Sequence, residues 1–305
     1  MKVFVTGGTG VIGTRAVPAL VVAGHEVSAV SRSAGKAELV RAMGATPVAV
    51  DLFDAGAVRR AVEGHGGVVH LATSIPSMVK AARASAWAAN DRLRSEASGN
   101  LVDAARRAGA ARYVQESIAF PYRDQGGAWI DEDHPVDHTR VFRSTADAEA
   151  AAARFSSSDG AGVVLRFAQF HGPGSSHVTA FNALARRRIN PFVGPPDAYT
   201  SFVHADDAGA AVAAALEVPA GTYNVADDEP LTRAEAGRVV AEALGVEPPH
   251  AVPAAGRALM PQLAKELMKS LRISNARLAR VSDWRPAHPS IRGSWWTATG
   301  EEARA

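Results

Sequence analysis

Short apolar segments alternate with amphipathic ones along the first half of the chain. Residues 1–6 form an apolar run typical of a buried parallel strand, and similar runs cover 25–30, 47–50, 66–73, 111–115 and 162–167. Between them lie segments whose apolar residues have helical spacing, over 14–24, 36–43, 55–63, 85–108 and 143–155. This alternation predicts right-handed βαβ units and one parallel sheet, with ligands at the carboxyl ends of the strands.

A glycine-rich turn follows the first strand. Gly7, Gly10 and Gly13 are spaced three apart, so the chain can bend sharply and bring backbone N–H groups against a pyrophosphate. The same spacing lets the next helix pack closely against the strand. The residues predicted to contact a dinucleotide here are Gly7, Thr9, Gly10, Val11 and Ile12.

The rhythm of the pattern changes after residue 170. It predicts helices over 177–188, 208–217, 231–244 and 257–271, and strands over 200–204 and 221–225. We therefore expect an α/β fold: a Rossmann-type doubly wound parallel sheet with a smaller C-terminal substrate lobe. The expected nucleotide-binding domain is 1–170 with its last elements from 200–226, and the expected lobe is 171–199 with 227–305.

Composition narrows the classes of function. With 305 residues, 47% of them apolar, the chain can bury a core, and the absence of cysteine excludes thiolate nucleophiles, disulfides and cysteine-ligated metals. The formal charge is +2 and the arginines are scattered without interleaved aromatic residues, so we expect no nucleic-acid partner. No apolar run is long enough to span a bilayer and no signal segment opens the chain, so we expect a soluble, cytoplasmic protein without a membrane partner.

The segment after the second predicted strand bears on the choice of cofactor. In a dinucleotide fold this segment lies beside the adenosine ribose, where an acidic residue would hold a free 2′-hydroxyl. The sequence offers Ser31 and Arg32 instead, and a guanidinium makes bidentate, charge-assisted hydrogen bonds to phosphate. The sequence therefore predicts NADP(H) rather than NAD(H).

Other cofactor contacts are expected at later strand ends. Asp51 and Leu52 follow the third strand, where an adenine edge would lie. Leu71, Ala72 and Thr73 end the fourth strand and would form the floor of the site, and Asn90 lies on the long helix that follows.

At this point the chain resembles a known family, the extended short-chain dehydrogenase/reductases of the NAD-dependent epimerase/dehydratase-like group. The resemblance rests on the glycine turn and on motifs in the family's order: Asp51-Leu52, His70-Leu71-Ala72, Asn90, Leu165-Arg166 through Gly172-Pro173-Gly174, Phe202-Val203-His204-Ala205-Asp206-Asp207 and Tyr223-Asn224-Val225. It covers nearly the whole chain. It also implies a homodimer through the helices at 85–108 and 143–155.

The chain departs from the family at its chemical centre. Family members use a Tyr-x-x-x-Lys pair assisted by a Ser or Thr, because the lysine lowers the pKa of the tyrosine that exchanges a proton with the substrate. Here the matching positions carry Val141, Thr145 and Ile118. No lysine lies between residues 81 and 264, so no shift of register restores the pair.

Three other residues are candidates for acid–base chemistry. They are Tyr122 just past the fifth strand, His171 after the sixth, and Ser117 at the end of the fifth. Each also has a structural interpretation, as a packed ring or a turn hydroxyl. Glu116 lies at a buried strand end, where it needs a partner, and Arg166 is the expected one.

Two further groups of residues complete the predictions. The acidic and histidine cluster over 131–138 has neither a helix-face pair nor a calcium-loop spacing, so we expect no metal. The substrate pocket should be largely apolar, with walls from Phe181, Phe192, Phe202, Met260, Leu263 and Trp295 or Trp296.

The sequence favours an atypical NADP(H)-binding oxidoreductase that acts on a small, largely apolar carbonyl or hydroxyl compound. Two alternatives stay open. One is an isomerase, cyclase or dehydratase that keeps the nucleotide without net redox change. The other is a catalytically inert protein that senses the cofactor, since Ile118, Val141 and Thr145 all depart from the family pattern.

Overall fold

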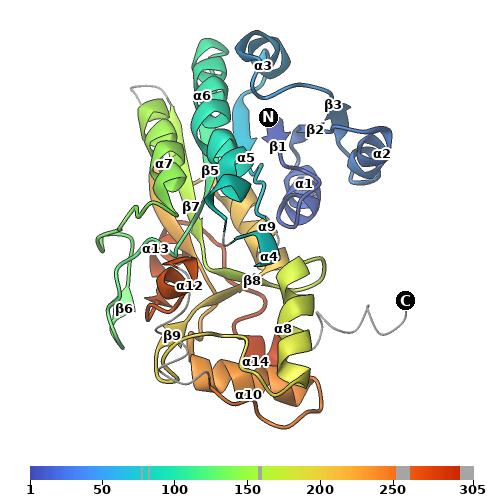
Figure 1. Cartoon of the computed structure of the whole chain (residues 1–305). Coiled ribbons are helices and arrows are strands. Elements are labelled where there is room, and N and C mark those ends of the chain that lie inside the picture. The colour runs from blue at the N-terminus through green and yellow to red at the C-terminus, as the bar shows by residue number, and fades with distance from the viewer. Residues whose placement is uncertain (77, 82, 157–159, 252–261, 296–305) are drawn as a thin grey trace.

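A computed structural model describes residues 1–76, 78–81, 83–156, 160–251 and 262–295. Its centre is one sheet of seven strands, all paired in parallel, in the order β3-β2-β1-β4-β5-β7-β11 (Figure 1). The strands are β1 (Lys2–Thr6), β2 (Glu26–Val30), β3 (Thr46–Val48), β4 (Gly67–His70), β5 (Arg112–Ile118), β7 (Ala161–Phe167) and β11 (Gly221–Val225). The predicted α/β fold with a doubly wound parallel sheet is confirmed.

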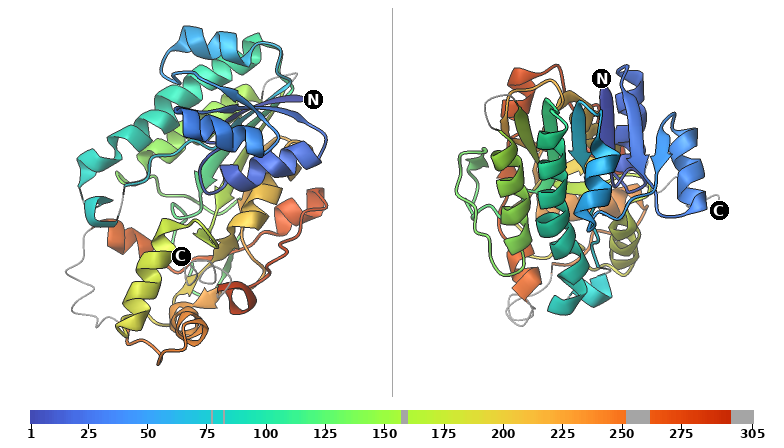
Figure 2. Two further views of the ribbon diagram at one scale, coloured as in Figure 1. Left: turned by 90° about the vertical axis from the view of Figure 1, so that its right-hand side faces the viewer. Right: turned by 90° about the horizontal axis from the view of Figure 1, so that it is seen from above.

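Helices cover both faces of this sheet (Figure 2). One face packs on α1 (Gly13–Val22), α2 (Ala34–Ala42) and α9 (Ala205–Ala214). The other packs on α3 (Ala55–Val62), α6 (Ser98–Arg107) and α7 (Arg143–Phe155). Because both faces are buried, the strands are nearly continuous apolar runs, which is the pattern that the sequence displays.

The helix expected over 85–108 is interrupted. It consists of a 3-10 turn (Ala84–Trp87), α5 (Ala88–Arg92), a π-helical turn (Leu93–Ala97) and α6, and the short α4 (Met78–Ala81) precedes it. A π-helical turn inserts a residue into the helical repeat, and such turns are common at functional sites. Here the carbonyl of Leu93 accepts from the N–H of Ser98 within the turn and also from His70 at 3.2 Å.

Most of the remaining described elements lie beyond the carboxyl ends of the strands (Figure 1). The helices are α8 (Ser176–Arg186), α10 (Arg233–Ala243), α12 (Gln262–Leu267), α13 (Ala276–Val281) and α14 (Ile291–Ser294). The strands pair as β8 (Gln169–His171) with β10 (Phe202–His204), β9 (Tyr199–Thr200) with β12 (Leu231–Thr232), and β6 (Trp129–Ile130) with β13 (Arg272–Ile273). α10 begins in a capping box, since Thr232 and Glu235 satisfy each other's backbone N–H groups.

These elements have an apolar core of their own, in which Phe192, Phe202 and Trp295 pack together. The segment after β13 instead returns to the sheet, because Leu278 and Trp284 belong to the core beneath α1 and α9. The domain boundaries given from the sequence stay a prediction. The first part of the helix expected over 257–271 lies outside the described residues. None of the described helices combines the length and apolarity needed to cross a bilayer.

Candidate cofactor and substrate site

The glycine turn forms a cradle that only glycine can line. Gly7 has φ 74°, and a Cβ atom there would lie 2.5 Å from the carbonyl of Leu71. A Cβ atom at Gly13 would lie 2.1 Å from the Gly7 oxygen, so α1 begins directly against the turn. Gly10 is exposed, and Ile12 before α1 offers no side-chain group to cap the first N–H groups. This cradle fits a pyrophosphate, which the backbone N–H groups and the helix dipole would hold.

The floor of the cradle is fastened by polar contacts at the ends of β1 and β4. The Thr6 hydroxyl donates to His70 Nδ1, and His70 Nε2 donates to the carbonyl of Leu93. Burial lowers the pKa of His70 to about 4, so the ring stays neutral. Asn90 is buried, and its side-chain oxygen accepts from the N–H of Ser74 at 3.0 Å. Asn90 thereby anchors the loop beyond Thr73, and its direct contact to a cofactor stays a prediction.

The adenosine side of the cradle carries the predicted basic residue. Ser31 is buried and its N–H donates to the carbonyl of Val48, whereas Arg32 is exposed. Ser33 caps α2 by accepting from the N–H of Lys36, and the first turn of this helix contains no acidic residue. A 2′-phosphate fits this position, because it would meet a guanidinium and the positive end of a helix.

The predicted adenine contacts are held in place by two side chains that the sequence analysis gave no such role. Asp51 is exposed and accepts from the N–H of Phe53 at 3.0 Å. Asn100 donates to the carbonyl of Leu52 at 3.0 Å, and the Arg92 guanidinium lies 3.7 Å from the centre of the Phe53 ring. α5 and α6, which carry Arg92 and Asn100, therefore hold Leu52 and Phe53 in place, and the adenine contact at Asp51 and Leu52 stays a prediction.

The two positions that should carry the tyrosine–lysine pair contain no acid. The Thr145 hydroxyl is buried and donates to the carbonyl of Phe142 at 2.6 Å, and His138 Nδ1 lies 3.0 Å from it. Val141 is partly buried and apolar. Neither side chain can exchange a proton with a substrate near neutral pH.

Ser117 and Tyr122 are tied into one buried network. The Ser117 hydroxyl donates to Glu149 at 2.7 Å, and Glu149 accepts two hydrogen bonds from Arg166 at 2.6 and 2.9 Å. Arg166 also donates to the Tyr122 oxygen at 2.8 Å, and the Tyr122 hydroxyl donates to Asn224 at 2.9 Å. This geometry favours a structural role for Ser117 and Tyr122, while their catalytic role stays a prediction.

The charge state of Tyr122 follows from its burial. Its side chain is fully buried, which raises the pKa of Tyr122 to about 12, although the Arg166 guanidinium opposes this shift. In the family, by contrast, a nearby lysine lowers the pKa of the catalytic tyrosine. The phenol of Tyr122 therefore holds its proton firmly.

The prediction that Arg166 pairs with Glu116 is wrong. Arg94 donates to both carboxylate oxygens of Glu116, at 2.9 and 3.2 Å, and both side chains are buried. Arg166 is occupied by Glu149 instead. Arg94 lies in the π-helical turn, which the sequence analysis did not predict.

His171 lies inside the aromatic core beyond the sheet rather than on an open surface. Its ring stacks on Trp295 with 6.0 Å between centroids and packs edge-on against Phe202. Neither ring nitrogen has a hydrogen-bond partner among the residues that the structure describes. Burial, together with the neighbouring histidines, lowers the pKa of His171 to about 3, so it is a neutral ring at physiological pH. Its acid–base role stays a prediction.

A lysine reaches the end of β5 from the C-terminal part of the chain. Lys269 Nζ donates to the carbonyls of Phe120 and Tyr122 at 3.3 Å and pairs with Glu266 at 2.8 Å. It holds the loop after β5. The sequence analysis missed this contact, because nothing in the local pattern shows that residue 269 folds back onto residue 120.

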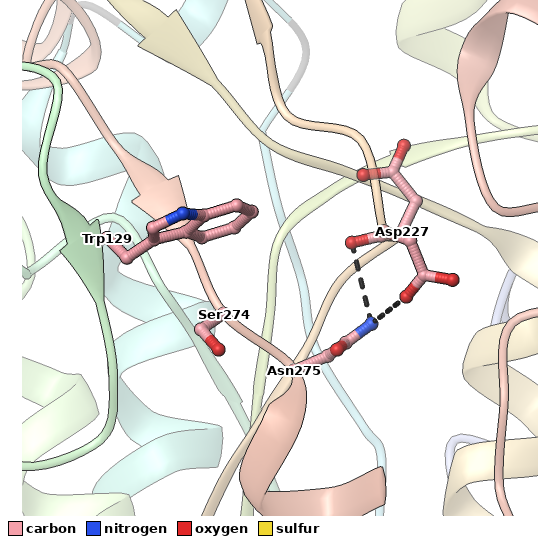
Figure 3. A pocket seen from close by; sticks show the side chains of 5 residues that line it. Trp129, Asp227, Ser274 and Asn275 are labelled. Carbon is pink, nitrogen blue, oxygen red and sulfur yellow. Dashed lines mark hydrogen bonds between the residues drawn. The ribbon is translucent and has the colours of Figure 1, made fainter.

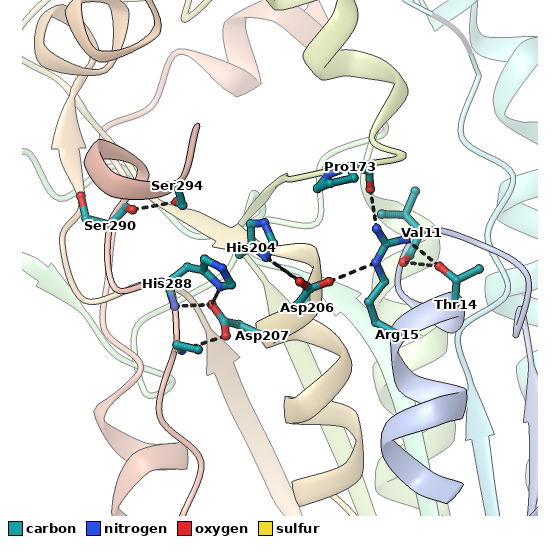
Figure 4. A network of polar contacts seen from close by, with 11 residues as sticks. Val11, Thr14, Arg15, Pro173, His204, Asp206, Asp207, His288, Ser290 and Ser294 are labelled. Atoms are coloured by element: carbon teal, nitrogen blue, oxygen red, sulfur yellow. Dashed lines mark hydrogen bonds and ion pairs between the residues drawn. The ribbon is translucent and has the colours of Figure 1, made fainter. Parts of the chain in front are cut away.

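Two clusters of acidic and histidine residues are present. In the first, over 131–138, the carboxylates already have partners: Glu132 and Asp133 pair with Arg277, and Asp137 pairs with Arg123. In the second, ligand atoms of His204, Asp206 and His288 lie within 4.8 Å of one another (Figure 4).

The second cluster is better described as a polar junction than as a metal centre. The rings of His204 and His288 stack at 3.8 Å with an interplanar angle of 26°, so their in-plane lone pairs do not converge on one point. The Arg15 guanidinium also lies 3.2 Å from the Asp206 carboxylate and supplies the positive charge that a cation would bring.

A cavity of about 240 Å³ lies next to the end of β11, an edge strand of the main sheet. It is lined by Trp129, Asp227, Asp228, Ser274 and Asn275 (Figure 3). Burial raises the pKa of Asp227 well above its ordinary value, and Asn275 donates to the Asp228 carboxylate at 2.8 Å. The sequence analysis did not identify this cavity.

The expected walls of the substrate pocket fall into two groups. Phe192, Phe202 and Trp295 are buried against one another, and Phe181 is partly buried beside them. Met260, Trp296 and the side chain of Leu263 lie outside the described residues.

Comparison with known proteins agrees with this geometry. A model of the NAD dependent epimerase/dehydratase family matches residues 3–226, which include the glycine turn and, apart from Lys2, the seven strands of the main sheet. The chain belongs to this family. It is also 38% identical over 311 residues to a 3-diazoavenalumate denitrifying reductase from a Streptomyces species, covering 96% of this chain and 98% of the relative. A reductase is therefore among the full-length relatives of this family member.

Solved structures show the same fold. Human epimerase family protein SDR39U1, solved with NADPH, has a TM-score of 0.80 and 22% identity, covering 98% of this chain and 99% of that one. UDP-glucose 4-epimerase from Thermus thermophilus, solved with NAD, has a TM-score of 0.75 and 26% identity, covering 98% of this chain and 99% of that one. The family and its structures imply an NAD(P) cofactor for this chain, and the glycine cradle fits one.

Proposed function

We propose that this family member is an NADP(H)-dependent reductase that transfers hydride to a small aromatic electrophile without help from a tyrosine–lysine pair. The observation that carries the proposal is the combination of a glycine cradle with Val141 and a buried, internally bonded Thr145. The site has the glycine turn that would bind the nucleotide, and it lacks the tyrosine–lysine pair that normally transfers the proton.

The preference for the phosphorylated cofactor rests on Arg32. This guanidinium is exposed at the start of α2, and Ser33 fixes that helix start. A 2′-phosphate bound here would accept charge-assisted hydrogen bonds, whereas the 2′-hydroxyl of NAD(H) would find no carboxylate among Ser31, Arg32 and Ser33.

The full-length relative suggests the substrate class. This relative, a 3-diazoavenalumate denitrifying reductase, is by its name a reductase that removes nitrogen from a diazo compound. We infer an arenediazonium compound as the leading substrate class for this chain. The aryl carbon gains hydride from the reduced nicotinamide, the carbon–nitrogen bond breaks, and its electron pair leaves with dinitrogen. The reaction balances without a proton, so it needs no acid at position 141.

The residues of this chain would then bind, orient and exclude water. Thr6, His70 and Asn90 hold the floor of the cradle in one position. Val141 and Ile118 place apolar groups where the family places hydroxyls, which keeps competing proton donors away from the reacting carbon. A carbonyl substrate is the second candidate. It would need a proton, and Ser117, Tyr122 or His171 would have to leave its present environment to supply one.

Turnover with NADPH tests the proposal. The purified protein is mixed with NADPH and a simple arenediazonium salt, and separately with a panel of aromatic and aliphatic carbonyl compounds. We expect NADPH oxidation above the protein-free rate with the diazonium salt. Product formation without NADPH oxidation would favour the isomerase or dehydratase alternative. NADPH binding without any turnover would favour the cofactor-sensing alternative.

A further inference from the structure

The side chain of Arg15 joins three elements beside the glycine turn (Figure 4). Arg15 lies in the first turn of α1. Its Nε donates to Asp206 at the start of α9 at 3.2 Å, and its Nη2 donates to the carbonyl of Pro173 at 2.8 Å. Its Nη1 donates to the Thr14 hydroxyl at 2.8 Å. One guanidinium therefore holds α1, α9 and the loop after β8 together.

Thr14 continues this connection into the glycine turn. Its hydroxyl donates to the carbonyl of Val11 at 3.2 Å, and Val11 is one of the residues predicted to contact the pyrophosphate. Two side chains, Arg15 and Thr14, thus separate Pro173 from the cradle. A displacement of the glycine turn would be transmitted to the loop that contains Pro173, because each hydrogen bond along the way has a defined geometry.

The backbone at Arg15 is fixed by close helix packing. A Cβ atom at Gly209 on α9 would lie 2.4 Å from the Cβ atom of Arg15, so the two helices touch where the glycine lacks a side chain. The Arg15 side chain is only 24% exposed. The guanidinium is therefore held in one place, next to Gly174, where a Cβ atom would lie 3.6 Å from Nη1.

The loop that Arg15 holds connects the main sheet region to the elements beyond it. Gly172 and Gly174 both have positive φ, at 109° and 82°, so the loop takes a conformation that other residues rarely adopt. The loop leads into α8, whose Val178 packs in the aromatic core with Phe202. The loop thus links the cradle to the part of the protein where we expect the substrate.

We propose that Arg15 is a positioning residue that holds the loop Gly172–Gly174 over the pyrophosphate and nicotinamide half of the bound nucleotide. The inference rests on the cofactor site proposed above. It assigns Arg15 no contact with the reacting atoms. It predicts instead that the loop and the nicotinamide half of the cofactor stabilise each other through the guanidinium.

Binding of two nucleotides to an Arg15→Met variant tests this inference. NADPH carries both halves of the cofactor, whereas 2′,5′-ADP carries the adenosine and 2′-phosphate without the nicotinamide. We expect Arg15→Met to raise the Kd for NADPH about tenfold, since it removes charge-assisted hydrogen bonds, and to leave the Kd for 2′,5′-ADP within about twofold. Arg154→Met is the matched control, because Arg154 pairs with Asp103 on the surface at 3.2 Å.

Amide hydrogen exchange supplies a readout that simple destabilisation would not reproduce. In the parent protein NADPH should slow exchange at Gly174 and Ser175, and in Arg15→Met this protection should be lost while 2′,5′-ADP still protects the segment around Arg32. Arg15→Lys keeps the charge but cannot span Asp206 and Pro173 together, so it should fall between the two. This variant also carries the test if Arg15→Met does not fold.

The outcomes distinguish a failure of the proposed cofactor from a failure of the role proposed for Arg15. A parent protein that binds neither nucleotide contradicts the proposed cofactor, and the inference falls with it. If the parent binds both nucleotides and the Arg15→Met variant binds each of them as tightly as the parent does, the inference about Arg15 is overturned and the proposed cofactor stands. Equal weakening of both nucleotides also overturns it, because the effect of Arg15 would then not be confined to the nicotinamide half.

Discussion

The Ser117 hydroxyl donates to the Glu149 carboxylate at 2.7 Å, at the end of the strand where the family places an assisting hydroxyl. Glu149 in turn accepts two hydrogen bonds from Arg166. The hydroxyl at this strand end therefore faces a carboxylate and a guanidinium inside the protein. Ser117, Glu149 and Arg166 lie near the position of the family's reaction centre, but their polar groups bond to one another.

Replacing Tyr122 by Phe tests whether this network is structural. We expect kcat/KM to stay within about threefold of the parent, whereas loss of a general acid would cost about a hundredfold or more. Stability should fall by about 1–3 kcal/mol, because Arg166 and Asn224 lose a buried partner. Urea unfolding and steady-state kinetics measure the two effects.

The matched control is Tyr113→Phe. Tyr113 is also fully buried on β5, and its hydroxyl donates to Gln115 at 2.8 Å. It should show a similar loss of stability and unchanged kinetics. A Tyr122→Phe variant that folds like this control yet loses a hundredfold in kcat would restore Tyr122 as the acid.

Replacing Arg32 by Ala tests the cofactor preference. Loss of a charge-assisted contact to the 2′-phosphate should raise the KM for NADPH about tenfold or more and leave the KM for NADH nearly unchanged. Arg41→Ala is the control, since Arg41 lies on α2, the helix that follows Arg32, and pairs with Glu38 on the surface. An unchanged ratio of NADPH to NADH efficiency in Arg32→Ala would count against the assignment.

The two buried histidines predict how stability depends on pH. Burial lowers the pKa of His70 to about 4 and that of His171 to about 3, where His204, His288 and His177 lower it further. In the unfolded chain these histidines have a pKa near 6.5, so between the folded and unfolded pKa values the unfolded chain binds more protons than the folded protein. Their contribution is fully present above about pH 6.5 and is lost as the pH falls toward the folded values.

At pH 5 this amounts to about 2 kcal/mol for each histidine. Urea unfolding at pH 7.5 and pH 5 measures the difference. His171→Phe, which fits the aromatic surroundings, should lose less stability between the two pH values than the parent does. An equal loss in both proteins would show that His171 titrates normally.

Removing one partner of the buried pair Arg94–Glu116 should be costly. Glu116→Gln leaves a buried guanidinium without its counter-charge, and breaking such a pair costs about 3–5 kcal/mol. Glu96→Gln is the control, because Glu96 pairs with Arg92 on the surface, where solvent screens the pair, and its loss should leave the stability nearly unchanged. Thermal or urea unfolding distinguishes the two. Equal costs would mean that the Arg94–Glu116 pair is not desolvated.

The parallel sheet and the glycine cradle could be predicted from the sequence, because their signals are local. Gly7, Gly10 and Gly13 lie within seven residues, and most strands of the main sheet are largely apolar runs. The strand and helix periods therefore identify the elements, and the right-handed crossover rule restricts how they connect.

The partners of buried charges could not be predicted in this way. Arg94, which meets Glu116, lies in a π-helical turn, and the local sequence pattern does not predict that turn. Lys269 contacts Phe120 across 149 residues of the sequence, and Arg15 contacts Asp206 across 191. Long-range contacts of this kind depend on the finished packing.

Isotope tracing tests the central claim most directly. The protein is supplied with NADPH deuterated at the transferable position of the nicotinamide and with an arenediazonium salt in ordinary water, and the arene product is analysed by mass spectrometry. We predict one deuterium in each product molecule, and none when unlabelled NADPH is used in deuterated water. Deuterium that enters the product from the solvent, or no product above the protein-free control, would contradict direct hydride transfer without a proton donor.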